Sequence, residues 1–447
     1  MNIISLSKNL LMLSFIAMLI VSASCSRTSV GHTEITKWQY GKKGAVSITY
    51  DDGSINQFRK AIPIMNRLEL SGTFFINTGS LSGSKYVGKF IGRPVSEIIS
   101  ESKTIPTNEN NVYERASAAR FLGFRETGNY FTQAGAQIDV DNYEEAYEIL
   151  DELYKKVANG ELQPTTPRNR TTNNDDNVLT WEMAKTYALQ GHEFASHMVT
   201  HPYLAALDET NILYELEKSK EEIIDQLGER YAFSAECPYG TENERVMEYA
   251  YEVYPALRNR MPEEYLLELN RPSLETPVNP NFEYVQWQRG AISSSALEEM
   301  KAWVDTAASQ GNIWLVLVIH GIDGIGWEAL TSEDVDAYFT YIKSRENDVW
   351  VATFGDATRY MKERMNATVS SSQESGKINV AVDHSLDKNL YDLPLTLKTY
   401  VNPKWKEVNI KQGNSVTRVK IQRERTAAFA MYQAMPGEGL IEISEIK

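Results

Sequence analysis

Cysteine is almost absent from this chain of 447 residues, which contains only Cys25 and Cys237. Cys25 follows an N-terminal hydrophobic run and is a candidate for lipidation, which would leave Cys237 without a partner in the same chain. An intramolecular disulfide is then excluded. The fold must therefore be stabilised by its hydrophobic core.

Long hydrophobic runs are also rare, and the one that stands out covers residues 10–21. It is too short to span a bilayer comfortably and predicts a secretory signal. The small residues before Cys25 are typical of a bacterial lipoprotein processing site, which predicts a signal peptide over 1–24, an acylated Cys25 and an N-terminal tether over 25–44. We expect a lipid-anchored protein of the cell envelope, facing the periplasm or on the outer-membrane surface. Simple cleavage near Ala23, with an unmodified cysteine, is the alternative.

Positively charged residues are fewer than negatively charged ones. The chain has 45 Lys and Arg against 60 Asp and Glu, a formal net charge of −15 and a pI near 5.1. Such a surface repels phosphate backbones, so we expect no nucleic-acid partner. The length and the 42% hydrophobic content predict a globular protein with one large domain and a smaller one.

Apolar strand-like runs alternate with helical segments along most of the chain. Strands throughout apolar, separated by helices, are typical of a parallel sheet buried on both faces. A (β/α) barrel is the closure that this pattern favours, with an open doubly wound sheet as the alternative. The predicted strands cover 45–50, 72–77, 193–196, 231–236, 313–320 and 349–354, and the predicted helices 56–69, 180–191, 208–228, 331–345 and 355–364.

Two regions interrupt this alternation. A long insertion at about 79–177 follows the second strand and is a candidate lid or substrate wall. After a barrel over 45–365, the Ser-rich stretch 366–377 predicts a linker. Residues 378–447 then alternate like strands and predict a small β-sandwich with an accessory role.

Histidine is scarce as well, and three of the six residues fall within ten positions: His192, His197 and His201. The spacing of His197 and His201 places two imidazoles on one side of a turn, a common arrangement for presenting two nitrogens to a metal. Such a pair also occurs in ordinary helix packing. His192 lies between a helix and a strand, where a structural role is expected.

Polar residues directly follow three of the predicted apolar strands. They are Asp51 with Asp52, His197 with His201, and His320. In a parallel barrel these strand ends meet at one rim, where active sites assemble. One aspartate and two neutral histidines make a three-ligand zinc site with a position left for water. A cation there also offsets the repulsion between adjacent carboxylates.

The motifs TYDDG (49–53), SHMVTH (196–201), CPYG (237–240) and VIHG (318–321) occur in this order. Together they resemble the polysaccharide deacetylases of carbohydrate esterase family four, the NodB-like domain, over about 45–364. The resemblance implies a distorted (β/α) barrel. It also implies metal-dependent removal of N-acetyl, and sometimes O-acetyl, groups from polysaccharides.

The resemblance implies a role for each matched residue. Asp51 corresponds to the catalytic base and His320 to the general acid. Tyr239 corresponds to the residue whose backbone N–H helps to form the oxyanion hole. Asp52, His197 and His201 correspond to the ligands of a divalent metal, expected to be Zn²⁺, with Co²⁺ or Ni²⁺ as alternatives. Water bound to that metal would attack the acetyl carbonyl of an acetylated glycan.

The sequence departs from the family pattern before the Pro-Tyr pair. Glu236 and Cys237 stand where the family often has an arginine that orients the catalytic aspartate. Arg258 and Arg289 are the candidates to replace it. Trp287 and Arg289 are also expected at the substrate. The alternatives to an N-deacetylase are an O-acetyl esterase acting on a glycan such as acetylated xylan, and a catalytically weak glycan-binding lipoprotein.

Overall fold

A computed structural model describes residues 29–165, 178–290, 293–425 and 427–446. Its centre is a sheet of nine parallel strands, with the order β6-β5-β4-β3-β2-β9-β8-β7 and with β10 paired to the first half of β2. The strands are β2 (Gly44–Tyr50), β3 (Thr73–Ile76), β4 (Glu193–Ser196), β5 (Ser234–Ala235), β6 (Ala256–Leu257), β7 (Leu266–Leu269), β8 (Tyr284–Gly290), β9 (Ile313–Ile319) and β10 (Val349–Val351).

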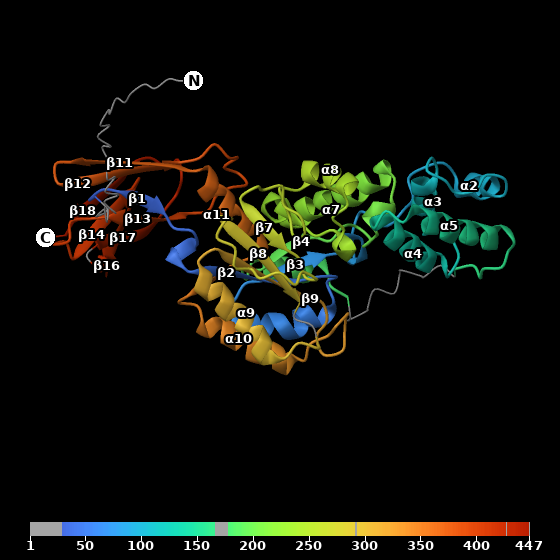
Figure 1. The fold of residues 1–447 in the computed structure, drawn as a ribbon, viewed down its shortest axis with the longest axis horizontal. Helices are drawn as coiled ribbons and strands as arrows, with labels where there is room; N and C mark the ends of the chain where they lie inside the picture. Colours follow the sequence, from blue (N-terminus) through green and yellow to red (C-terminus); the bar gives the residue numbers. More distant parts are fainter. Residues whose placement is uncertain (1–28, 166–177, 291–292, 426, 447) are drawn as a thin grey trace, which may run out of the picture.

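The sheet curves without closing, because its end strands β6 and β7 do not pair with each other. Every residue of β2 and β9 is buried, as expected for strands that are covered on both faces. The prediction of a distorted (β/α) barrel is therefore confirmed, in an open form (Figure 1).

Helices surround this sheet, and several begin at a side-chain cap that the sequence encodes. The hydroxyl or carboxylate at the cap accepts a hydrogen bond from a backbone N–H of the first turn, as at Thr180, Asp208, Thr331 and Thr353. A π-helical turn (Gln57–Ala61) leads into α1. The helices are α1 (Ile62–Arg67), α6 (Trp181–Ala188), α7 (Glu209–Leu227), α8 (Glu244–Val253), α9 (Leu297–Gln310), α10 (Ser332–Ser344) and α11 (Phe354–Asn366).

The insertion forms a helical projection at one end of the molecule (Figure 1). Residues 166–177 of the predicted insertion lie outside the described residues. Its helices are α2 (Val95–Ser102), α3 (Val112–Ala119), α4 (Thr127–Asp139) and α5 (Tyr143–Ala158).

Two antiparallel sheets lie at the opposite end (Figure 1). Apolar side chains from both sheets, among them Val380, Leu397 and Ile443, meet in one core, which confirms the predicted β-sandwich. One sheet has the order β1-β13-β17-β16 and the other β11-β12-β18-β14-β15. These strands are β1 (Thr33–Ile35), β11 (Thr368–Glu374), β12 (Lys377–Asp383), β13 (Leu395–Tyr400), β14 (Glu407–Gln412), β15 (Ser415–Lys420), β16 (Gln422–Glu424), β17 (Ala427–Ala434) and β18 (Ile441–Glu445).

Two boundaries of the prediction need correction. The segment 366–377, predicted as a linker, continues α11 for one residue and then forms β11, a strand that pairs with β12 along its whole length. The side chains of β11 are mostly exposed and therefore polar, which is why its composition is that of a linker. The predicted tether 25–44 contributes β1, which pairs with β13 of the sandwich.

The barrel and the sandwich share apolar packing. Trp314 of β9, Phe354 and Tyr360 of α11, and Leu395 of β13 belong to one buried cluster. The hydroxyl of Tyr360 also donates a hydrogen bond to the carbonyl of Thr36, next to β1. The two units are therefore packed against each other through α11.

Cys25 and the predicted signal peptide lie outside the described residues. Within the part of the chain that the structure describes, no helix combines the length and the hydropathy needed to cross a membrane. Cys237 is buried, and burial raises the pKa of its thiol, so the protonated form is favoured.

His192 is a buried structural histidine that anchors the start of β4. The backbone N–H of Gly72 donates to its Nδ1 at 3.2 Å, so its Nε2 carries the proton and donates to Asn66 Oδ1 at 3.1 Å. Burial lowers the pKa of His192 to about 4. The imidazole is therefore neutral in the folded protein at neutral pH.

This histidine should make stability depend on pH. Between pH 6.5 and 4 the unfolded chain binds a proton at His192 that the folded chain does not, so the free energy of unfolding falls as the pH falls through that window. The full effect corresponds to about 3 kcal/mol. The variant His192→Gln should be less stable at pH 7, yet its deficit relative to the wild type should shrink towards pH 4. Urea denaturation at several pH values measures this, and a constant deficit would contradict it.

Candidate active site

The functional side chains lie at one edge of the sheet because parallel strands present their carboxyl ends together. Asp51 and Asp52 follow β2, His197 follows β4, and His320 follows β9. Arg258 follows the two-residue strand β6. They line a cavity of about 1090 Å³.

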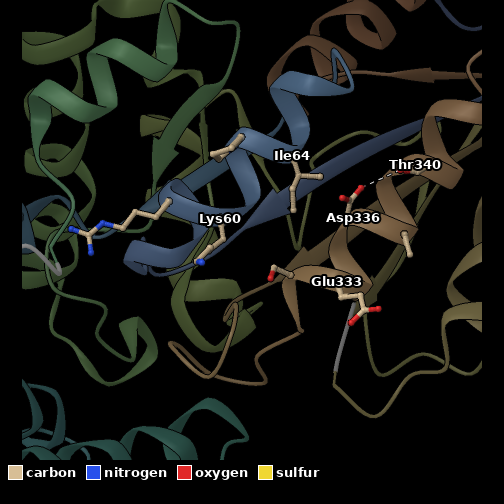
Figure 2. A pocket seen from close by; sticks show the side chains of 9 residues that line it. Lys60, Ile64, Glu333, Asp336 and Thr340 are labelled. Carbon is tan, nitrogen blue, oxygen red and sulfur yellow. Dashed lines mark hydrogen bonds between the residues drawn. The ribbon is translucent and has the colours of Figure 1, made fainter.

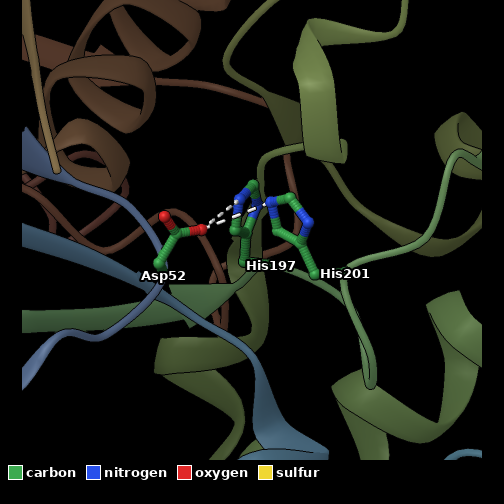
Figure 3. A group of neighbouring side chains, drawn as sticks. All are labelled: Asp52, His197 and His201. Atoms are coloured by element: carbon green, nitrogen blue, oxygen red, sulfur yellow. Dashed lines mark ion pairs between the residues drawn. The ribbon is translucent and has the colours of Figure 1, made fainter. Parts of the chain in front are cut away.

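Asp52, His197 and His201 form the cluster shown in Figure 3. Asp52 Oδ1 lies 3.6 Å from His197 Nε2 and 3.3 Å from His201 Nε2, and one ligand atom from each residue lies within 4.8 Å of the other two. Zinc–ligand bonds of about 2.0–2.1 Å at tetrahedral angles place ligand atoms roughly 3.3 Å apart. The three residues fit a divalent metal with a further position open.

The orientation of His197 and the charge of Asp52 suit metal binding. Nδ1 of His197 donates to the carbonyl of Glu236 at 2.9 Å, which directs Nε2 towards the cluster. Burial would raise the pKa of Asp52, but His197 and His201 outweigh it and hold that pKa well below its usual range. Asp52 therefore provides a charged oxygen ligand.

Asp51 is held apart from this cluster by a different partner. Arg258 donates to both of its carboxylate oxygens, from Nη1 to Oδ1 at 2.6 Å and from Nη2 to Oδ2 at 2.7 Å. Burial would raise the pKa of Asp51, but the guanidinium outweighs it and lowers the pKa. The adjacent aspartates thus avoid repulsion because each faces its own positive or proton-donating partner.

Arg258 joins Asp51 to Glu236. Its Nη2 lies 3.1 Å from Glu236 Oε1, and its Nη1 also donates to Thr49 Oγ1 at 2.9 Å. Burial raises the pKa of Glu236 to about 7, even though Arg258 opposes that effect. Glu236 occupies the position at which the sequence comparison expected an arginine. It instead pairs with Arg258, which follows the next strand, β6.

Of the two arginines considered from the sequence, the geometry places only Arg258 against Asp51. Arg289, at the end of β8, lines the cavity elsewhere. Its guanidinium lies 4.7 Å from the ring centre of Trp287, which also lines the cavity. The short strand β6 gives no periodic signal, so the sequence could not rank the two candidates.

His320 completes the group around Asp51. Its Nε2 lies 3.4 Å from Asp51 Oδ2, and its ring meets Trp327 edge-on with the centroids 4.8 Å apart. Burial lowers the pKa of His320, although Asp51 partly offsets this. The base-like carboxylate and the acid-like imidazole are thus adjacent.

Tyr239 lies beside His201 of the cluster. Its ring centre is 4.7 Å from that of His201 and 3.7 Å from that of Tyr203, on which it stacks. Three site residues, Asp52, His201 and Tyr239, have φ values of 70°, 57° and 64°. Left-handed conformations of non-glycine residues cost on the order of 1–3 kcal/mol each and gather at functional sites.

The described part of the insertion supports the histidine loop. Arg120 donates to Oγ1 and to the carbonyl of Thr200, between the two histidines of the cluster. From α7, Glu215 accepts hydrogen bonds from the backbone N–H groups of Val199 and Thr200. None of the described insertion residues lines the cavity, so the expected lid or wall is not seen among them.

A second hollow lies outside the barrel, between the π-helical turn with α1 and α10 (Figure 2). Asp336, which lines it, pairs with Arg67 and accepts a hydrogen bond from Thr340. We assign no chemistry to it.

The sequence did not reveal several cavity residues. Trp327 and Arg271 lie on loops, and Gln288 lies in the missed strand β8, where it donates to the carbonyl of Arg258 at 2.9 Å. The one available signal was an aromatic residue closely following His320. The polar residues of β8, such as Gln288, gave no indication that this segment is a strand with side chains inside the barrel.

The positioning effect of Arg258 can be tested. In the variant Arg258→Lys one ammonium replaces the two-pronged guanidinium, so Asp51 keeps a positive neighbour but loses its fixed orientation. We expect kcat of the reaction at this site to fall roughly 10²-fold, the order of effect that a displacement of about 1 Å produces. The control is Arg260→Lys, two residues further on, where the side chain is partly exposed beside Glu244. Equal kcat values for the two variants would contradict the role of Arg258.

Comparisons with known proteins agree with this site. The sequence profile of the polysaccharide deacetylase family matches residues 138–253, a stretch that includes both histidines of the metal cluster and Tyr239. A gellan lyase from Bacillus sp. is 25% identical over 277 residues, or 58% of this chain. The chain spans only 11% of that relative's length.

Solved structures give weaker likenesses. A putative polysaccharide deacetylase from Mycobacterium smegmatis is 12% identical with a TM-score of 0.37, covering 75% of this chain and 96% of that one. A family 4 carbohydrate esterase from Streptomyces lividans is 10% identical with a TM-score of 0.33, covering 71% and 95%. At such scores these likenesses decide nothing. The polysaccharide deacetylase family model thus matches residues 138–253 of this chain, a stretch that contains the histidine loop and the Pro-Tyr motif of the site.

Proposed function

We propose that this protein is a metal-dependent hydrolase that removes N-acetyl groups from a polysaccharide or oligosaccharide. The observation that supports it is that the adjacent aspartates contact different partners. Asp52 faces the two histidines, whereas Asp51 is gripped by Arg258 beside His320. Metal-assisted hydrolysis of an amide uses a metal site together with a separate base and acid.

Asp52, His197 and His201 would hold the metal, with Zn²⁺ favoured by the mixture of imidazole and carboxylate ligands and Co²⁺ or Ni²⁺ as alternatives. When bound, such a cation polarises the acetyl carbonyl and makes water at the site more acidic.

Asp51 acts as the base in this proposal. Asp51 is ionised and buried, and two hydrogen bonds from Arg258 fix its orientation. Each carboxylate oxygen keeps a further lone pair that can accept a proton from the attacking water. The positive charge of Arg258 is shared with Glu236, which limits how strongly it suppresses the basicity of Asp51.

His320 acts as the acid. It protonates the departing amine nitrogen as the C–N bond breaks, which yields acetate and the free amino sugar. The backbone N–H of Tyr239 would stabilise the negative oxygen of the tetrahedral intermediate. Trp287 and Arg289 would contact the substrate, and the buried indole N–H of Trp287, which has no partner in the described structure, is a donor for it.

Acetate release from a panel of acetylated glycans tests the proposal, with the metal content measured on the same sample. N-acetylglucosamine oligomers should release acetate, and a chelator should abolish the release. Release from acetylated xylan alone would favour an O-acetyl esterase. No release from any member of the panel by a metal-loaded protein would leave only a glycan-binding role.

The proposal also places the enzyme at the cell envelope, anchored by lipid at Cys25, with an acetylated glycan as its partner. This part is supported by the N-terminal sequence alone, whose residues 1–28 lie outside the described structure.

A further inference from the structure

One wall of the cavity carries an exposed aromatic ring beside the acid histidine. Trp327 is 52% exposed and lies on the loop between β9 and α10, edge-on to His320. Large aromatic rings bury apolar area when they can, and an exposed ring in a cavity offers a flat surface for stacking. The C–H-rich face of a sugar ring matches such a surface.

Arg271 stands over this ring with its guanidinium 5.0 Å from the ring centre. Arg271 forms an ion pair with Glu328, whose Oε2 lies 3.7 Å from Arg271 Nη1, a separation longer than a hydrogen bond. Both of these atoms are buried, and neither has a hydrogen-bond partner in the described structure. Arg271 therefore has an unused donor at the cavity wall.

Arg289 adjoins the same wall. Its guanidinium donates only to backbone carbonyls, those of Arg271, Ser273 and Gln288, at 3.2–3.4 Å. No carboxylate lies within ion-pair distance of it among the described residues, although Glu299 also lines the cavity. An arginine that no carboxylate neutralises is notable in a chain whose net charge is −15.

We propose that Trp327 and Arg271, with Arg289 beside them, form a subsite for a carboxylate-bearing sugar next to the acetylated residue. The sugar ring stacks on Trp327, and its carboxylate accepts hydrogen bonds from Arg271, which presents them in the fork geometry that matches a carboxylate. This inference rests on the proposed function and deepens it. The substrate class is an acetylated glycan that also contains uronic acid.

The test is binding to the wild-type protein by calorimetry. The probes are hyaluronan and oligogalacturonate oligosaccharides, each compared with its carboxyl-reduced form. For at least one backbone the carboxylated form should bind about tenfold tighter, as expected for a charge-assisted hydrogen bond, and the difference should shrink with added salt. Equal affinities for both backbones would overturn the subsite.

Variants locate the effect. Arg271→Met should abolish the preference and Arg271→Lys should keep part of it, whereas Trp327→Ala should weaken both forms of a probe alike. Arg418→Met, which removes an exposed arginine of β15 paired with Glu407, is the control. A preference that survives Arg271→Met unchanged would also overturn the subsite. Acetate release without any carboxylate preference would leave the proposed function standing, and a preference without acetate release would refute the function alone.

Discussion

Replacing Asp52 by asparagine should remove the metal and, with it, acetate release. Asp52 supplies the one charged ligand of the cluster, and a neutral amide is a poor substitute on a borderline cation. We expect purified Asp52→Asn to lose most of its metal and to release acetate at the background rate. Metal analysis by mass spectrometry, together with an acetate assay, measures both quantities.

The fold should survive this change, because Asp52 is only partly buried at the cavity and asparagine has nearly the same shape. The control is Asp336→Asn. It alters an exposed carboxylate of α10 that pairs with Arg67 of α1, and it should leave metal content and activity unchanged. If Asp52→Asn keeps a full complement of metal, the ligand set is wrong.

Replacing Asp51 by asparagine should give the opposite pattern, with the metal retained and turnover lost. A positioned general base contributes roughly 10²–10⁴ in rate, so kcat should fall by about that factor. Arg258 would lose one carboxylate partner but keep Glu236, so its buried charge stays paired and the chain should remain folded. Metal content and kcat on the same preparation decide the result.

The pair of variants also tests which aspartate has which role. A metal-free Asp51→Asn beside a metal-loaded Asp52→Asn would reverse the assignments. Retention of metal and activity in both variants would place the reaction elsewhere in the molecule.

The rim of the barrel could be predicted because its strands are apolar throughout. β2 and β9 are runs of buried residues that end directly at Asp51 and His320, so the strand and the functional residue appear in one short stretch of sequence. The same holds for β4 and His197. Parallel topology then brings the three ends together.

The partner of Asp51 could not be predicted with the same certainty. Arg258 lies 207 residues from Asp51 and follows a strand of two residues, too short for any periodic pattern. Strand β8 was missed because its inward side chains include Gln286 and Gln288, which hydrogen-bond to the carbonyl of Arg258. A polar barrel interior removes the apolar pattern by which strands are recognised.

The exposed strand β11 was missed for the opposite reason. Its serines point mostly to solvent and are held by backbone pairing with β12, so its composition gives no sign of a strand. Pairing that depends on the backbone of a distant segment is not encoded in local periodicity.

Titration of the metal-free protein with Zn²⁺ tests the central claim most directly, with acetate release from N-acetylglucosamine oligomers as the readout. Our account predicts that release rises in proportion to added metal, breaks at one equivalent per chain, and is absent in Asp52→Asn at the same metal concentrations. Acetate release at the full rate by the metal-free wild type, or an unchanged titration curve in Asp52→Asn, would contradict it.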